Sequence, residues 1–298
     1  MAVLLVRYGE LALKSPPVRR EFESSLRRNI LDQFVREGLS GRVRSDRGHL
    51  YVETDDGERG AKLVRRVFGV TSVSLVEDVP SEPAAITARL LELADPRLRP
   101  GSRFAVRARR TGQHPFTSQQ LAGDIGGAVL ERFADRRLRV DLERPEVELF
   151  VEVRGPRTYL YFDRFPGPGG LPLGVAGRLV ALVDGPRGAL GTFFMMKRGC
   201  RVGLVVLPEG ETFVNETLAR FDPTARVAHS APEVSTWTPV LAKLAEDSHA
   251  DGVVLPIGVD EYSSFVAQWG DRVLFSPTVG LTDEEVNERW KSVAALVS

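Results

Sequence analysis

Residues 2–34 read AVLLVRYGELALKSPPVRREFESSLRRNILDQF. The run at residues 2–8 is rich in aliphatic and β-branched side chains, which predicts a strand. The triplet Ser-Pro-Pro at residues 15–17 then offers an N-cap followed by proline in the first helical turn. Gly38 marks the end of that helix. The apolar residues of the helix recur every four positions and predict one buried stripe of Val18, Phe22, Leu26, Ile30 and Phe34.

A hairpin, a second helix and a further strand follow. Residues 41–45 and 49–54 flank a glycine-containing turn, a pattern typical of a hairpin. Residues 61–68 are predicted to be helical, and residues 71–77 are predicted to form the next strand. The order β-α-β-β-α-β is the ferredoxin-like split motif. Residues 1–77 are therefore predicted to form an N-terminal ferredoxin-like domain.

A second α+β domain is predicted over residues 78–168. The helix that Ser118 is expected to cap contains Gly123, Gly126 and Gly127, although each glycine costs about 1 kcal/mol relative to alanine. Close packing against another element is the predicted reason for these glycines, and the approach of a ligand backbone is the alternative. The helices and strands of this domain are expected at residues 86–94, 104–109, 118–133, 147–153 and 158–165.

The segment GPGGLPLG at residues 167–174 is dense in turn residues and predicts a domain joint. Beyond it, over residues 175–298, strands and helices alternate along the chain. This alternation predicts a doubly wound, Rossmann-like α/β domain with helices on both faces of a parallel sheet. Because ligands of such sheets bind beyond the carboxyl ends of the strands, residues 184–189 are the first place to look for chemistry.

Composition limits the classes of function. The chain has 298 residues, 43% apolar and 27% charged, which excludes disordered and low-complexity classes. No apolar run approaches the roughly 20 residues of a membrane helix, so we expect a cytoplasmic protein without a membrane partner. The net charge of zero hides a charge of +5 over residues 1–172 (29 basic against 24 acidic) and −5 over the rest. This asymmetry indicates an anion-binding front.

Cysteine and histidine usage limits the chemistry further. The single cysteine, Cys200, excludes an internal disulfide and a thiolate zinc cluster, and we expect it to be a small buried hydrophobic residue. The four histidines are scattered along the chain, so no metal site is predicted. No pair of carboxylates stands out as acid and base, and no catalytic residue is predicted.

The segment FAVRARRTGQHPF at residues 104–116 carries the first candidate site. Arg107 and Arg109 share one face of the predicted strand, and Arg110 and His114 follow on a loop beside Phe116. Arginine forks beside an aromatic ring hold phosphates and stack on bases. The alternative is a solvated basic strand.

Three further segments are weaker candidates. Lys14 lies on the loop after the first strand, and Gly169 and Gly170 lie in a segment whose bare backbone suits either a phosphate loop or a hinge. The segment LVDGPRGALG at residues 182–191 has the strand–loop–helix order of an anion site, but it matches neither the P-loop nor the dinucleotide motif. Its Pro186 also lacks an amide proton.

Four segments together resemble the tRNA 4-thiouridine synthetase (tRNA sulfurtransferase) family. They are VRYGELALKSPPVRREFE (residues 6–23), RFAVRARRTGQHPFTS (residues 103–118), FPGPGGLPLG (residues 165–174) and MMKRGCRV (residues 195–202). The resemblance implies a ferredoxin-like domain, a THUMP domain and a C-terminal pyrophosphatase-like domain that binds adenine nucleotide. It further implies a homodimer whose first two domains grip the acceptor and CCA end of tRNA. The implied tRNA contacts are Lys14, Arg107, Arg109, Arg110, His114, Gly169 and Gly170.

The C-terminal domain departs from the family pattern at the ATP loop. Where the family reads Ser-Gly-Gly-x-Asp-Ser, this chain reads Asp184-Gly185-Pro186-Arg187-Gly188-Ala189. The persulfide-carrying cysteine that the resemblance implies downstream is also missing after Cys200. Losing one oriented donor at a catalytic site costs about 10²- to 10³-fold in rate, so the loop is expected to be degenerate and to need no ATP as cofactor.

We therefore expect a tRNA-binding protein that supports modification by a separate modifying or sulfur-donor enzyme. One alternative is an active tRNA sulfurtransferase that uses ATP at a non-standard loop or a cysteine supplied by a partner. The other is a small-molecule binding protein that does not bind RNA.

Overall fold

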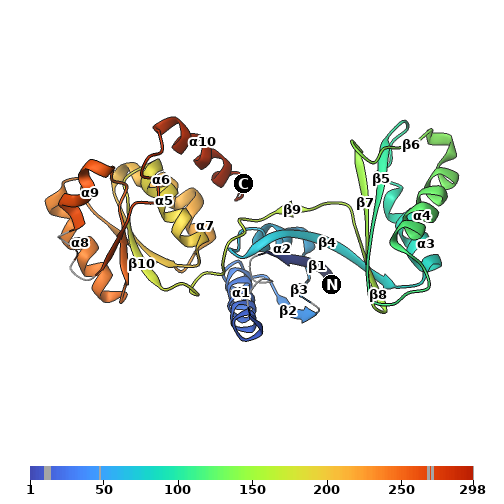
Figure 1. Ribbon diagram of the computed structural model, residues 1–298, viewed down its shortest axis with the longest axis horizontal. Helices are drawn as coiled ribbons and strands as arrows, with labels where there is room; N and C mark the ends of the chain where they lie inside the picture. The colour runs from blue at the N-terminus through green and yellow to red at the C-terminus, as the bar shows by residue number, and fades with distance from the viewer. Residues whose placement is uncertain (10–14, 47, 267–268, 270–271, 298) are drawn as a thin grey trace.

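The computed structural model describes residues 1–9, 15–46, 48–266, 269 and 272–297. Figure 1 shows an elongated molecule with the N-terminal domain at its centre and the C-terminal domain at one end. The second domain along the chain lies at the other end, and we call it the middle domain because it is the middle one in the sequence. Within those ranges no helix is long and apolar enough to cross a bilayer.

The N-terminal domain has the predicted order of elements. Helix α1 buries Leu26, Ile30 and Phe34 of its apolar stripe, whereas Val18 in its first turn is exposed, contrary to the prediction. Gly38 follows the helix with a φ of +64°. Strand β1 lies between β3 and β4 and pairs antiparallel with both. The elements are β1 (Ala2–Tyr8), α1 (Pro16–Arg36), β2 (Gly41–Asp46), β3 (His49–Thr54), α2 (Gly57–Val64) and β4 (Val70–Pro80).

Helix α2 begins earlier than the sequence pattern predicts. Asp56 accepts a hydrogen bond from the Arg59 backbone amide at 3.0 Å and caps the helix. The helix ends at Val64, so Phe68 lies beyond it rather than on its apolar face. The prediction of a helix over residues 61–68 was therefore wrong at both ends, because the cap was overlooked.

The middle domain extends the same sheet. Its strands join β4 to give a nine-stranded sheet of order β2-β3-β1-β4-β8-β7-β5-β6, with β9 also paired to β4. The boundary predicted between residues 77 and 78 falls inside β4, which belongs to both domains. The elements are α3 (Pro83–Ala94), β5 (Arg103–Thr111), α4 (Ser118–Arg132), β6 (Arg139–Val140), β7 (Val147–Arg154), β8 (Arg157–Tyr161) and β9 (Phe165–Pro166).

Two predictions for α4 need correction. Thr117, not Ser118, is the N-cap and forms a capping box with Gln120. The three glycines of the helix are not explained by close packing, because a Cβ added at any of them meets no described atom within 4 Å. The outer side of α4 is therefore bare.

Alternation along β4 divides the shared sheet into two faces. Val73 packs in the core with α1 and α2, and Val79 packs in the core with α3 and α4. Val76 points the other way and joins Tyr51, Phe150 and further residues in a separate cluster. All four helices thus cover one face of the sheet, and the opposite face, here called the helix-free face, is continuous across both domains.

The C-terminal domain contains a five-stranded parallel sheet of order β12-β11-β10-β13-β14. Helices α5 and α10 pack in the core on one face, and α8 packs on the other, as predicted. The elements are β10 (Arg178–Val183), α5 (Pro186–Lys197), β11 (Arg201–Val206), α6 (Glu211–Phe213), α7 (Ala219–Phe221), β12 (Val227–His229), α8 (Val234–Asp247), β13 (Gly252–Val254), α9 (Val259–Val266), β14 (Val273–Phe275) and α10 (Asp283–Ala294).

The N-terminal and C-terminal domains share apolar and polar contacts. Phe68 is fully buried in the core of the C-terminal domain, with its ring 5.4 Å from that of Phe193 and 5.2 Å from that of Phe221. The Gln33 amide on α1 donates to the Arg220 carbonyl at 3.0 Å. Phe68, which the sequence pattern assigns to the N-terminal domain, thus completes the core of the C-terminal domain.

Candidate nucleic-acid interface

Two adjoining cavities of about 680 and 460 Å³ lie between the middle and N-terminal domains, lined by the helix-free face of the sheet and by the first turn of α4. They share the lining residues Ala108, Arg109, Ser118, Glu152 and Arg164, so they form one continuous depression, here called the basic groove. Six arginines line it against two glutamates. The arginines are Arg7, Arg107, Arg109, Arg110, Arg154 and Arg164, and the glutamates are Glu148 and Glu152.

Strand alternation explains why the arginines of β5 face the groove. Val106 and Ala108 pack toward α3 and α4, so Arg107 and Arg109 point to the helix-free face. The parallel register places Arg107 beside Phe150 and Arg109 beside Glu152 on β7. The predicted pairing of these two arginines on one face is therefore confirmed.

Arg107 and Arg109 differ in what they bind. The Arg107 guanidinium donates to the Glu148 carboxylate at 2.8 Å and to the Leu142 carbonyl at 2.7 Å. Arg109 is exposed, and across the part of the chain that the structure describes no hydrogen bond or ion pair engages its guanidinium. Arg109 is thus the arginine of this strand with its donors available for a ligand.

Arg110 lies near the end of β5 rather than on the loop where the sequence places it, and His114 lies on the loop after β5. The Arg110 guanidinium donates to the Gly112 carbonyl at 3.2 Å, and the His114 Nε2 lies 3.3 Å from the Thr111 carbonyl. The His114 ring is 5.4 Å from that of Phe116. Arg110 lines the basic groove, whereas His114 is held at the loop beyond it.

The other predicted RNA contacts lie elsewhere. Lys14 is outside the described residues. Gly169 donates its amide to the Val70 carbonyl at 2.8 Å, and a Cβ on Gly170 would come within 2.1 Å of the Lys197 carbonyl. Both glycines lie at the joint between domains, and their roles in binding RNA stay a prediction.

Sequence analysis missed three arginines of the groove. Arg7 comes from β1, Arg154 from β7, and Arg164 from the loop between β8 and β9. Arg7 and Arg154 each stand in a strand of mostly apolar residues. This pattern is the signal in the sequence that could have identified them. Period-two alternation assigns each side chain to a face, but it does not say which strands lie side by side.

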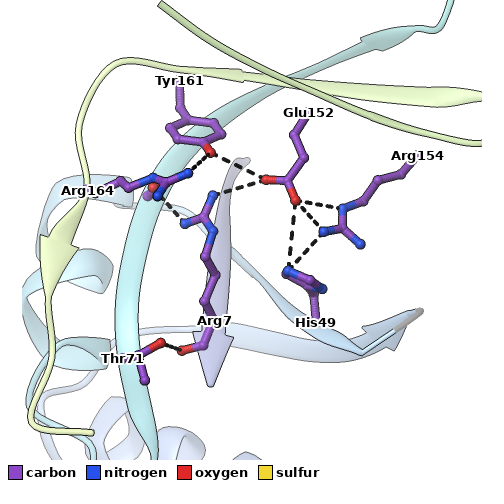
Figure 2. A network of polar contacts seen from close by, with 8 residues as sticks. Arg7, His49, Thr71, Glu152, Arg154, Tyr161 and Arg164 are labelled. Carbon is purple, nitrogen blue, oxygen red and sulfur yellow. Dashed lines mark hydrogen bonds and ion pairs between the residues drawn. The ribbon is translucent and has the colours of Figure 1, made fainter. Parts of the chain in front are cut away.

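A buried carboxylate lies at the centre of the groove. Glu152 is 7% exposed. Its Oε2 accepts from Arg7 at 3.2 Å and from the Tyr161 hydroxyl at 3.4 Å, and its Oε1 accepts from Arg154 Nε at 3.0 Å. Figure 2 shows these side chains converging on the carboxylate, with His49 beside Arg154. Burial works to raise the pKa of Glu152, but the hydrogen bond and charge of Arg154 and the charge of Arg7 outweigh it, so the pKa lies below its usual range.

The aromatic pair of Phe150 and Tyr161 contacts Arg164. The rings of Phe150 and Tyr161 stack with centroids 4.8 Å apart. The Arg164 guanidinium lies 4.5 Å above the Phe150 ring and donates to the Tyr161 hydroxyl at 2.9 Å. Its position is set by stacking and by this hydrogen bond, and the residue is exposed to solvent.

The loop predicted to be a degenerate nucleotide site is tightly packed at Gly188 but open at Gly185, where an added Cβ would meet nothing within 4 Å. Pro186 through Ala189 form the first turn of α5. A Cβ on Gly188 would come within 2.5 Å of the Leu182 carbonyl, so this glycine is required by packing.

Arg187 and Asp184 are the charged side chains of this loop. The Arg187 guanidinium donates to the Thr278 carbonyl at 2.9 Å, the Leu281 carbonyl at 2.8 Å and the Asp283 carboxylate at 2.8 Å. Burial raises the pKa of Asp184, and its buried Oδ1 has no hydrogen-bond partner among the described residues. With Pro186 lacking an amide proton, few donors remain for a phosphate.

Cys200 and the possible metal ligands among the described residues are further candidates for a reactive site. Cys200 is 5% exposed, burial raises the pKa of its thiol, and its Sγ lies 3.3 Å from the Ala176 carbonyl. Its prediction as a small buried residue is confirmed. No cluster of three metal-ligating side chains occurs in the described ranges.

Two family models match the chain. The ThiI ferredoxin-like domain matches residues 3–74, and the THUMP domain matches residues 82–163. A probable tRNA sulfurtransferase of Methanothermobacter thermautotrophicus is 36% identical over 206 residues, which cover 67% of this chain and 51% of that protein. That of Methanosarcina acetivorans is 36% identical over 243 residues, covering 80% of this chain and 57% of its own. The chain spans about half the length of the curated relatives it matches.

Two solved structures share the whole architecture. PH1313 from Pyrococcus horikoshii Ot3 has a TM-score of 0.81 at 26% identity and covers 98% of this chain and 99% of its own. A 4-thiouridine synthetase solved as an RNA complex with bound ATP has a TM-score of 0.79 at 21% identity, covering 100% and 86%. The ferredoxin-like and THUMP domains, the sulfurtransferase relatives and this shared fold together show that the chain belongs to the tRNA 4-thiouridine synthetase family.

Proposed function

We propose that this protein binds the acceptor and CCA end of tRNA in the basic groove and supports tRNA modification without ATP-dependent adenylation of its own. The observation that carries the proposal is the convergence of six arginines, from both the N-terminal and the middle domain, in one groove with two glutamates. The curated relatives named tRNA sulfurtransferases favour tRNA over other polyanions.

The chemistry of the groove suits a single-stranded RNA end. Guanidinium groups bind phosphates through paired hydrogen bonds and stack on bases, and Arg109 and Arg164 both present donors to the open side. Ser118 and Gln119, in the first turn of α4, line the same groove. The amides of that turn add a partial positive charge, and the bare glycines of α4 leave room for an RNA backbone beside it.

Binding to tRNA is expected to weaken steeply with salt. Each phosphate neutralised by an arginine releases counterions, so log Kobs should fall linearly with log salt, by about 0.7 per contact for single strands and 0.9 for duplex. Fluorescence anisotropy with labelled tRNA measures this slope, and the same tRNA lacking its CCA end is the matched control, expected to bind more weakly. A flat salt response, or equal binding of both RNAs, would contradict the proposal.

ATP is expected to leave the melting temperature unchanged. A ligand at 100 times its Kd adds about 2.7 kcal/mol of stability, which a thermal melt detects easily. The packed turn at Gly188 and the bound guanidinium of Arg187 leave little room for a triphosphate. Melting followed by circular dichroism, with and without millimolar ATP and Mg²⁺, is the measurement, and tRNA serves as the positive control.

Two outcomes would replace the proposal with its alternatives. A clear rise in melting temperature with ATP, together with tRNA-dependent ATP turnover, would favour an active sulfurtransferase that takes a cysteine from a partner. Failure to bind any tRNA at low salt would favour a small-molecule binding protein. Under the favoured function a separate modifying or sulfur-donor enzyme supplies the chemistry, and the protein acts as a homodimer.

A further inference from the structure

Glu152 is a buried negative charge on the floor of a groove that receives a polyanion under the proposed function. It lies on β7, directly beside Arg109 of β5 in the sheet register. Its side chain is 10% exposed, close to the 14% of Arg7 and the 8% of Arg154, the two arginines that it pairs with. A carboxylate in this place repels phosphate, so its presence needs a reason other than direct binding.

The contacts of Glu152 cross from one domain to the other. Arg7 belongs to β1 of the N-terminal domain, 145 positions away in the sequence, and Arg154 belongs to the middle domain. Arg154 in turn lies 2.9 Å from the Nε2 of His49 on β3. A single carboxylate therefore joins side chains of β1, β3 and β7, at the point where the two domains meet.

The surrounding contacts leave Arg7 and Arg154 with one geometry. Arg7 also donates to the Ser74 hydroxyl at 3.0 Å, and its guanidinium lies 4.8 Å from the centre of the Tyr161 ring. Two neighbouring guanidinium groups without a carboxylate between them would repel each other and rotate into solvent. With Glu152 in place, both guanidinium groups are held within the groove before any ligand binds. The conformational entropy of these two side chains is then already lost on folding, so binding does not have to overcome it.

We propose that Glu152 is a positioning residue that fixes Arg7 and Arg154 in the basic groove and holds the N-terminal and middle domains at one angle, so that RNA meets a preset array of donors. This inference rests on the proposed tRNA-binding function. It makes a prediction opposite in sign to that of simple electrostatics. Removing a negative charge from a phosphate-binding groove should tighten binding by charge alone, whereas losing a positioning residue should weaken it.

The decisive variant is Glu152→Gln, which keeps the shape of the side chain and removes its charge. We expect tRNA to bind about tenfold more weakly, as measured by anisotropy at low salt, the usual scale of a 1.4 kcal/mol loss. Glu131→Gln is the matched control, because Glu131 is an exposed glutamate of the same domain, at the end of α4 and outside the lining of the groove. That change should leave affinity equal or higher.

A second variant and a second measurement guard against unfolding. Glu152→Asp keeps the charge but shortens the side chain, so electrostatics predicts unchanged affinity, whereas positioning predicts intermediate weakening. Spin labels on Val35→Cys and Val140→Cys, both exposed and in different domains, report the distance between the domains without RNA. We expect a broader distance distribution in Glu152→Gln than in the parent protein.

The outcomes separate the two proposals. If the parent protein fails to bind tRNA, the proposed function is wrong, and the distance measurement still tests the role of Glu152 in holding the domains. If the parent binds tRNA but Glu152→Gln binds equally or more tightly, the positioning role is wrong and the proposed function stands. An unchanged distance distribution would also overturn the positioning role.

Discussion

Phe68→Ala is expected to lower the free energy of unfolding by about 3–5 kcal/mol, the usual cost of removing a buried phenylalanine ring. Phe68 has no exposed surface, and its ring packs against those of Phe193 and Phe221, which also contact each other. Although it comes from the N-terminal domain, the cavity that its loss creates lies in the core of the C-terminal domain. We therefore expect the variant to destabilise a domain to which the mutated residue does not belong.

Tryptophan fluorescence makes this effect measurable. The three tryptophans, Trp237, Trp269 and Trp290, all lie in the C-terminal domain, so urea unfolding followed by their emission reports on that domain. Phe165→Ala is the matched control, because Phe165 is 38% exposed and its loss should cost less than about 1 kcal/mol. If Phe68→Ala leaves the tryptophan-monitored midpoint unchanged, the packing of the two domains described here is wrong.

Arg109→Ala is expected to weaken tRNA binding about tenfold. A hydrogen bond to a charged group contributes about 1.5–3 kcal/mol, and 1.4 kcal/mol corresponds to a factor of ten. Arg109 is exposed and engages no other described side chain, so its removal should take away a phosphate contact without disturbing the fold. The slope of log Kobs against log salt should become shallower by about one contact.

Two comparisons isolate the contribution of Arg109. Arg107→Ala should reduce affinity less, because the Arg107 guanidinium is already bound to Glu148 and to the Leu142 carbonyl. Arg139→Ala removes an exposed arginine from β6, outside the groove lining, and should leave both affinity and salt slope unchanged. Equal affinity of Arg109→Ala and the parent protein would remove Arg109 from the interface.

The candidate site shows which of its residues strand periodicity can predict. Alternation along residues 104–109 identified Arg107 and Arg109 as partners on one face, and the register with β7 agrees. The same periodicity gave no reason to select Glu152, because a glutamate in a strand is ordinarily solvated. Its burial depends on Arg7, which reaches it from β1 across the domain boundary.

The glycines show a different limit. Gly170 and the glycines of α4 look alike in the sequence, since each interrupts a segment where another residue would be more stable. In the structure Gly170 packs against the Lys197 carbonyl, whereas Gly126 faces open space. The sequence indicates where a backbone is bare, but only the packing tells whether protein already fills the space beside it.

The amino-acid sequence by itself determined the order of the elements in the N-terminal domain, the apolar stripe of α1 and a loop at positions 184–189 that matches neither the P-loop nor the dinucleotide motif. These features depend on residues within a few positions of one another, through helix and strand periodicity, capping and the loss of backbone donors. Tertiary structure alone decided that six arginines meet in one groove and that Phe68 completes the core of another domain. Those contacts join residues far apart in the sequence, 145 positions in the case of Arg7 and Glu152, and only the sheet register and the docking of the domains bring them together.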